Sequence, residues 1–149
     1  MTNENVGKLG DVLRALDHIM LTTHDQSGHV VGRPMVLRVD HFDGSLFLIA
    51  PRDSRVVANI RANPEVNIAY TGPKTSLSVA GRATVSPNRD QVAARWHRGL
   101  DSWLPGGADS AALIEITVDE ARFWTYTGEQ HSPLPIRGEM RQIDVADFV

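Results

Sequence analysis

Apolar and polar residues alternate with a period of two along much of the chain, which is the pattern of half-buried β-strands. The clearest case is the segment 76–85, where Leu77, Val79 and Ala83 share one face and Ser76 and Ser78 lie on the other. Comparable runs predict further strands at residues 18–23, 30–39, 46–50, 66–70 and 112–126.

Apolar residues at helical spacing predict three helices between these strands. The first covers residues 6–16 and the second covers about residues 53–62, with Asp53 as its expected N-cap. The third starts at Ser86-Pro87, where serine would cap the helix and proline would fill its first position.

Two local signals refine the predicted sheet. Asp43-Gly44 lies between two apolar runs and predicts a β-hairpin there. Pro34 lies inside a predicted strand, and proline cannot donate a ladder hydrogen bond. It therefore predicts a sheet edge, a bulge or a place where pairing stops.

Six short strands with tight turns and two or three helices predict a mainly β protein with flanking helices, built as one antiparallel barrel domain over residues 1–149. A barrel this small has few deep pockets, so we expect dimerisation to build a ligand cleft between two subunits. The net charge of −3 disfavours nucleic-acid binding. The chain lacks an apolar run of membrane-spanning length, a secretory signal and cysteine, so we expect a cytoplasmic protein that binds no membrane.

The strand at residues 46–50 leads into the second helix through Asp53-Ser54-Arg55. Free N–H groups at a helix start favour an anion, and a guanidinium can donate two hydrogen bonds to a phosphate. Arg33, beside Pro34, could supply a second cation. The local pattern alone fits a capped and solvated helix start better than a phosphate site.

Other candidate sites have weaker support. The six histidines show no metal-binding spacing, and no serine has the setting of a catalytic nucleophile. We therefore predict no metal site and no catalytic side chain. Trp96, Trp103 and Trp124 could form the wall of a cofactor site, although tryptophan more often packs in the core.

In their order and spacing these segments resemble the flavin-binding split-barrel superfamily typified by pyridoxamine 5′-phosphate oxidase, and more closely its general stress protein branch. The resemblance covers about residues 8–126 and leaves residues 127–149 as a C-terminal arm. The matching segments are Gly32-Arg33-Pro34-Met35-Val36-Leu37-Arg38, Leu46 to Ala50 with Asp53-Ser54-Arg55 and Ala62-Asn63-Pro64, Ser76 to Ala83, Trp103-Leu104-Pro105-Gly106-Gly107, and Phe123-Trp124.

The resemblance implies a six-stranded antiparallel split barrel that forms a homodimer, with FMN in two clefts at the interface. It also implies cofactor contacts, carried over position by position. Arg33 and the backbone of Pro34, Met35 and Val36 would line the flavin, and Ile49 and Ala50 would lie near its ring or ribityl chain. Ser54 and Arg55 would bind the phosphate. Ser76 and Ser78 would make a contact from the fifth strand, and Trp103 would close the site.

Two positions differ from the oxidases of the superfamily. Val56 stands where they commonly carry lysine, and Ser76 stands where they carry glutamine. Losing one cation should weaken phosphate binding by about 1–2 kcal/mol. The substrate-binding C-terminal segment of the oxidases has no clear counterpart after Tyr126.

The resemblance therefore implies an FMN-binding oxidoreductase-like protein with small-molecule electron donors and acceptors. Two alternatives use the same fold: a non-catalytic flavin-binding or flavin-storing stress protein, and a reductase that uses the deazaflavin F420. An F420 enzyme would need extra basic residues, for which Arg38, Arg52 and Lys74 are available. A heme protein with His24 or His97 as ligand is a fourth, weaker interpretation.

Overall fold

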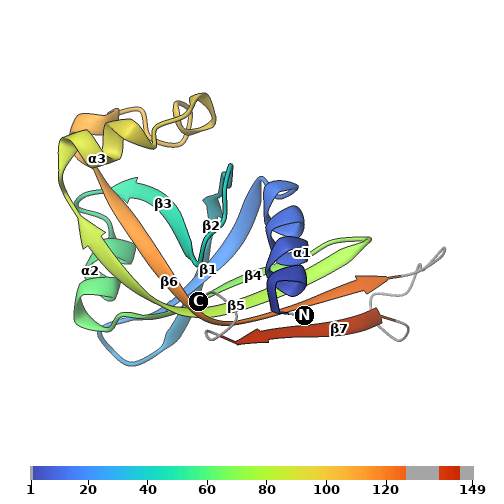
Figure 1. Cartoon of the computed structure of the whole chain (residues 1–149). Helices are drawn as coiled ribbons and strands as arrows, with labels where there is room; N and C mark the ends of the chain where they lie inside the picture. The colour runs from blue at the N-terminus through green and yellow to red at the C-terminus, as the bar shows by residue number, and fades with distance from the viewer. Residues whose placement is uncertain (1, 127–137, 145–149) are drawn as a thin grey trace.

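The computed structural model describes residues 2–126 and 138–144, with side chains for residues 7–125. Its strands form one curled antiparallel sheet in the order β2-β1-β4-β5-β6-β3, with β7 paired to β6 (Figure 1). The strands are β1 His18–His24, β2 Val30–Val36, β3 Ser45–Pro51, β4 Glu65–Thr71, β5 Thr75–Ser86, β6 Ala111–Tyr126 and β7 Gly138–Asp144.

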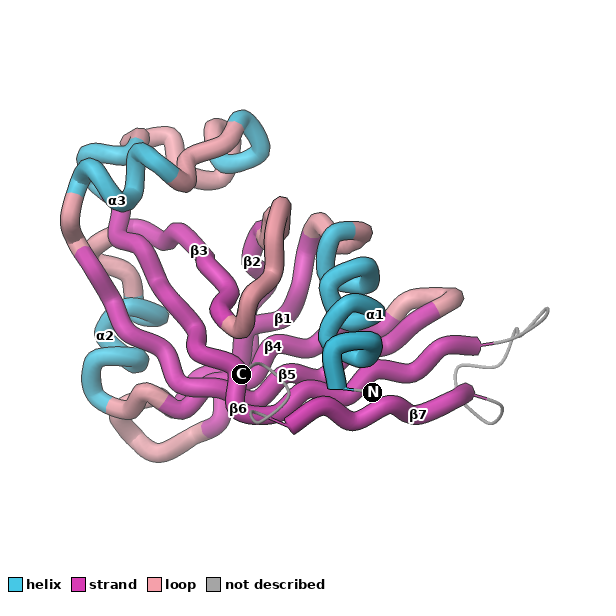
Figure 2. Tube along the Cα trace, in the orientation of Figure 1, coloured by secondary structure: helices cyan, strands magenta, loops and turns pink. Residues whose placement is uncertain are grey.

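The helices lie around this sheet (Figure 2). They are α1 Thr2–Arg14, α2 Arg55–Ala62 and α3 Arg89–Ala94, with the 3₁₀ turns η1 Arg98–Leu100 and η2 Ala108–Ser110. α3 and the two 3₁₀ turns form a layer at the end of the sheet where β3 and β6 begin or end. The mainly β split-barrel fold with flanking helices is confirmed.

Two hydrophobic clusters form on the two faces of β3 and β6. Leu46, Leu48 and their β6 partners Ile116 and Ile114 are at most 1% exposed and belong to the main core. The neighbouring β3 residue Ile49 points the other way, into a second cluster beneath α3 and the segment that follows it. Strand alternation in the sequence therefore places consecutive residues in two separate cores.

The predicted hairpin at Asp43-Gly44 is wrong. Within the described residues β2 pairs with β1 and β3 pairs with β6, so the strands on either side of this turn do not pair with each other. Gly44 does take the positive φ expected of a turn glycine, at 112°. Its carbonyl, however, accepts a hydrogen bond from the N–H of Val118 at 3.0 Å, which directs the chain to β6.

Both predicted helix caps shift by one or two residues. Ser54, not Asp53, is the N-cap of α2, and its Oγ accepts from the N–H of Val57 at 3.4 Å. Asn88, not Ser86, caps α3 and accepts from the N–H groups of Asp90 and Gln91.

The other predicted helices and strands are present with changed bounds, such as α1 at Thr2–Arg14 where residues 6–16 were expected. β6 is one long strand, as expected for residues 112–126, and Pro34 does lie on an edge strand of the sheet. β7 occupies part of the predicted C-terminal arm at residues 127–149, while residues 127–137 and 145–149 lie outside the described part of the chain.

A bulge between Ala80 and Gly81 shifts the register of β5 against β6. At Gly81 the backbones come so close that an added Cβ would lie 2.5 Å from the carbonyl oxygen of Thr117 and 2.9 Å from Cγ2 of Ile116. Only glycine fits there without a shift of the neighbouring strand.

Gly81→Ala should therefore lower the free energy of unfolding by about 1–3 kcal/mol through overpacking. The matched control is Gly7→Ala on α1, where nothing lies within 4 Å of the added Cβ. That control should leave stability unchanged or raise it by up to about 1 kcal/mol. Urea unfolding followed by circular dichroism measures both variants, and equal effects would contradict this account of the bulge.

Candidate functional site

The sheet is split between β2 and β3. Because β2 pairs only with β1, and β3 only with β6, each strand has one edge without a partner strand in the described chain. Such an edge presents unpaired N–H and C=O groups. The predicted cofactor residues 33–36 lie on β2 and residues 49–50 on β3, so the fold brings these two segments to opposite sides of the split.

Three of these residues turn their side chains into the protein. Met35 is 8% exposed, Ile49 7% and Ala50 1%. Any contact that they make with a ligand in the split must therefore come mainly from their backbone. The side chain of Val36 is half-buried and lines both of the cavities described below.

The predicted phosphate site lies where β3 passes into α2. Ser54 caps the helix, and Arg55 is its first residue, exposed and without an ion-pair partner among the described residues. Arg33 is equally exposed and unpaired within that part of the chain. α2 contacts the β1–β2 hairpin through the Nδ2 of Asn59, which donates to Oγ1 of Thr23 at 3.2 Å.

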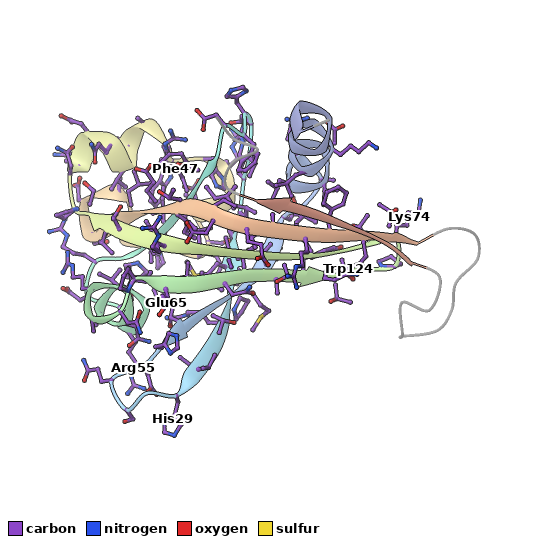
Figure 3. The ribbon with its side chains drawn as sticks, turned by 60° about the horizontal axis from the view of Figure 1, so that its bottom comes forward. His29, Phe47, Arg55, Glu65, Lys74 and Trp124 are labelled. Atoms are coloured by element: carbon purple, nitrogen blue, oxygen red, sulfur yellow. The ribbon has the colours of Figure 1, made fainter. Side chains whose placement is uncertain are left out.

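The hairpin and the helix start therefore lie at the same end of the molecule. Figure 3 shows Arg55 and His29, at the tip of that hairpin, both pointing away from the body of the protein. Lys74 lies at the opposite end.

Ser76 and Ser78 lie on β5, which is separated from β2 by two strands. Ser76 is buried and is paired with Trp124 on the neighbouring strand β6, while the Oγ of Ser78 accepts from Nδ2 of Asn67 at 3.1 Å. The fold does not bring either serine to the split, and their predicted cofactor contacts stay a prediction.

Two adjoining cavities lie beside the split, beneath the segment that follows α3. The first has a volume of about 630 Å³ and is walled by β3 residues, including Phe47 and Ile49, and by residues 94–97. The second, of about 380 Å³, lies between residues 14–18 and Trp103. Volumes of this size suit a small organic ligand.

Trp103 reaches the second cavity through a contact with β1. Its ring centroid lies 5.5 Å from that of His18, with the two planes tilted by 47°. Trp103 is nevertheless 47% exposed, which is high for so large an apolar side chain. In the first cavity the guanidinium of Arg95 stacks on Phe47, with Cζ 3.3 Å from the ring centroid.

Sequence reasoning did not name Arg95, which lines the first cavity. It named His97 only as a possible heme ligand and Arg38 only as a possible cation for an F420 tail, and it did not place them in one cavity. The segment Arg95-Trp96-His97-Arg98 concentrates cationic and aromatic residues after a helix, and that cluster was the available signal. Burial, and then the nearby charge of Arg38, lower the pKa of His97, while Asp40 and Asp101 act in the opposite direction.

Among the side chains of residues 7–125 no three His, Asp or Glu residues come together as a metal site. No helix in the described part of the chain is long and apolar enough to cross a membrane.

A family model described as pyridoxamine 5′-phosphate oxidase like matches residues 4–135, which is most of the chain. The chain belongs to the pyridoxamine 5′-phosphate oxidase-like family. No curated protein sequence matches it.

Several solved structures of low sequence identity share the fold. A protein from Clostridium acetobutylicum related to general stress protein 26 superposes with a TM-score of 0.77 at 11% identity, covering 99% of both chains. A heme binding protein from Mycobacterium smegmatis gives 0.69 at 16% identity, over 99% of this chain and 60% of that one. An F420 reductase gives 0.62 at 18% identity, over 74% of this chain and 93% of that one.

The corrected cap of α2 can be tested without a ligand. Ser54→Ala removes the side-chain oxygen that accepts from Val57, so it should lower the free energy of unfolding by about 0.5–2 kcal/mol. Asp53→Ala is the matched control and should have little effect, because its carboxylate caps nothing in the structure. Guanidinium unfolding measures both, and a larger loss for Asp53→Ala would restore the original assignment.

Proposed function

We propose that the chain binds FMN along the split and acts as a flavin-dependent oxidoreductase. The proposal rests on the free edges of β2 and β3, together with the start of α2 that follows β3. That helix start is capped by Ser54 and carries Arg55, which is exposed and has no ion-pair partner among the described residues. Unpaired backbone groups suit the polar edge of a flat ring, and the helix start suits a phosphate.

The phosphate would be held by Ser54, Arg55 and Arg33. The hydroxyl of Ser54 accepts from the Val57 N–H, which leaves its own proton free to donate to an anion. The N–H groups of the first helical turn have no acceptor within the helix. Arg33 and Arg55 need not give up an ion pair before they bind an anion, because neither forms one with the described residues.

Val56 limits the expected affinity. It is 2% exposed and packs in the main core, at the position where oxidases of the superfamily commonly carry a lysine. The third cation of those enzymes is therefore replaced by a core contact. We expect weaker FMN binding than in a site with all three cations.

The bound flavin would supply the electron-transfer chemistry, and the protein would bind and orient it. Backbone groups on the β2 edge would fix the orientation of the ring, and the buried side chains behind them would exclude water from one side. No side chain is required as an acid, base or nucleophile for electron transfer itself, so we assign none to that step.

A non-catalytic flavin-storing protein would use the same contacts, and the general stress protein neighbour shares the fold. The F420 alternative has less support from the charges. Arg52 donates to the backbone oxygen of Asp109, Arg38 is paired with Asp40, and Lys74 lies far from Arg55. These three residues are therefore poorly placed to hold a long polyanionic tail.

We also propose that the protein is a homodimer, with the β1–β2 hairpin in its interface. Four large apolar side chains in the described region are exposed, and three of them lie on this hairpin: Met20 at 44%, Val30 at 67% and Val31 at 37%. Large apolar side chains exposed on one hairpin favour a protein contact there. A second subunit at this place would lie beside Arg33 and complete the wall of the flavin site.

Arg55→Ala should weaken FMN binding about 10- to 100-fold, the equivalent of one lost charge-assisted contact. Riboflavin, which lacks the phosphate, should bind wild type and variant equally. Titration followed by flavin fluorescence measures both ligands. Arg61→Ala, at the other end of α2, is the matched control and should bind FMN like the wild type.

Unchanged FMN affinity in Arg55→Ala would contradict the phosphate assignment. The proposed function would be overturned if the protein bound none of FMN, FAD and F420. If FMN binds, anaerobic addition of NADPH and NADH separates the two flavin hypotheses. Bleaching of the bound flavin supports an oxidoreductase, and no bleaching with either nicotinamide favours storage.

Val30→Asp should dissociate the dimer, because a charge would replace the most exposed of the three exposed apolar side chains on the β1–β2 hairpin. Light scattering after size-exclusion chromatography should then give the mass of one chain, against two chains for the wild type. Thr84→Asp, exposed on β5, is the control for adding a charge to the surface. A monomeric wild type would contradict the proposed assembly.

A further inference from the structure

His97 lies where the two cavities meet. Both cavities are lined by Val36, Arg38, Val39, Asp40 and His97, and we call the space around these five residues the His97 cleft. It adjoins the split at Val36, but it does not include Ser54 or Arg55. A ligand in the cleft would therefore be separate from a phosphate at the start of α2.

The imidazole of His97 is held in place by the backbone beside it. An added Cβ on Gly99 would lie 3.1 Å from Nδ1 and 3.2 Å from Cε1, so the ring packs directly on this glycine. The carbonyl of His97 accepts from the N–H of Leu100 at 3.0 Å. Within residues 7–125 no side chain hydrogen-bonds the imidazole, so it keeps its capacity to bind a ligand.

The walls of the cleft favour a flat ligand. Phe47 and the guanidinium stacked on it form one planar surface in the first cavity, and Trp103 forms another in the second. Figure 3 shows Phe47 beside the α3 layer, on the side of the molecule away from Arg55. Aromatic and guanidinium faces both stack on planar rings.

Three charged groups act on the pKa of His97: Arg38, Asp40 and Asp101. Arg38 and Asp40 follow β2, and Asp101 follows His97 itself. The other ionisable groups on the walls are Arg14, Asp17 and His18 in the second cavity, and His41, Asp43, Arg95 and Glu115 in the first.

These charges favour an unprotonated imidazole next to a permanent cation. Burial and Arg38 lower the pKa of His97, so the ring is mainly neutral at neutral pH. A neutral imidazole can accept a proton. The guanidinium of Arg38 donates from Nε to Oδ1 of Asp40 at 3.3 Å, and its two terminal nitrogens can still stabilise a small anion formed beside it.

We propose that the His97 cleft binds a small planar molecule with an acidic O–H, of the phenol or enol type, and that His97 takes its proton on binding. The O–H bond of the ligand breaks and an N–H bond forms on the imidazole. The products are a ligand anion and an imidazolium, and no electron is transferred. Arg38 and the imidazolium then both face the anion. This site goes beyond the proposed flavin function and needs no bound flavin.

The test uses flavin-free protein and 4-nitrophenol, whose anion is yellow and whose neutral form is nearly colourless. The titration is run about one pH unit below the pKa of the free phenol. Wild type should bind the phenol and turn it yellow. His97→Asn should bind it at least about 10-fold more weakly and leave it colourless, because asparagine accepts no proton at this pH.

Two further variants separate proton transfer from packing. Gly99→Ala keeps the imidazole but displaces it, so it should give an intermediate affinity and a weaker yellow colour. His29→Asn, on the distant hairpin, should behave like the wild type. Thermal unfolding followed by circular dichroism identifies any variant that is not folded, and the His97→Asn and His29→Asn pair still decides the question if Gly99→Ala is lost.

The pH dependence gives a second readout that a packing role would not produce. Between the pKa of His97 and that of the phenol, the affinity should be constant, because binding takes up and releases no net proton. It should fall as the pH drops through the lowered pKa of His97, because the imidazole is then already protonated. Absence of binding, colourless binding to wild type, or equal yellow binding to His97→Asn would each overturn the proposal. FMN titration of the same proteins reports independently on the flavin function.

Discussion

The structure depends on a ladder of hydrogen bonds that runs from β2 through four strands to β3 and does not close. The sheet curls enough to bring its two end strands to the same side of the molecule, yet the turn at residues 37–44 sends β3 to pair with β6 instead of with β2. Closure would remove both free edges. Because it does not occur, backbone groups of β2 and β3 stay available beside a continuous core, and the segment after α3 can pack over one side of the opening. Every candidate contact in the split depends on the fact that β2 and β3 do not pair with each other.

Most of the fold could be predicted from local patterns, because alternation and helical spacing reflect which residues are buried. The strict alternation of residues 76–85 gave the correct face for Leu77, Val79 and Ala83, since β5 lies in the middle of the sheet with neighbours on both edges. The errors occurred where two local solutions are nearly equal. Asp53 and Ser54 are both good helix caps, and a turn with Asp43-Gly44 can end a hairpin or redirect a chain. In the second case the carbonyl of Gly44 bonds to Val118, a residue 74 positions away, and no local pattern contains that contact.

The candidate site, like the fold, has parts that local sequence patterns indicate and parts that they do not. The position of Ser54 and Arg55 at the start of a helix could be predicted, because the strand and the helix that follows it form one continuous segment of sequence. The His97 cleft could not, because its five shared residues come from two segments about 60 positions apart, and the cavities exist only after α3 packs against β3 and β6. Ser76 and Ser78 illustrate the opposite problem. The family pattern predicts a cofactor contact for them, and strand order puts two strands between them and β2, so within one chain the pattern does not show how they would reach a ligand in the split.

Val56 connects packing to binding at the start of α2. A valine there is buried against the core and strengthens the attachment of the helix, while a lysine would have to extend toward the ligand and give up that contact. Asn59, one turn later, adds a buried hydrogen bond to Thr23 on β1. The helix is thus fixed by two contacts that face the core, and its cationic first turn is fixed with it. A rigid site loses less entropy on binding than a mobile one. Under the proposed function, a well-held helix start with Arg55 in its first turn would offset part of the affinity that the missing third cation would have given.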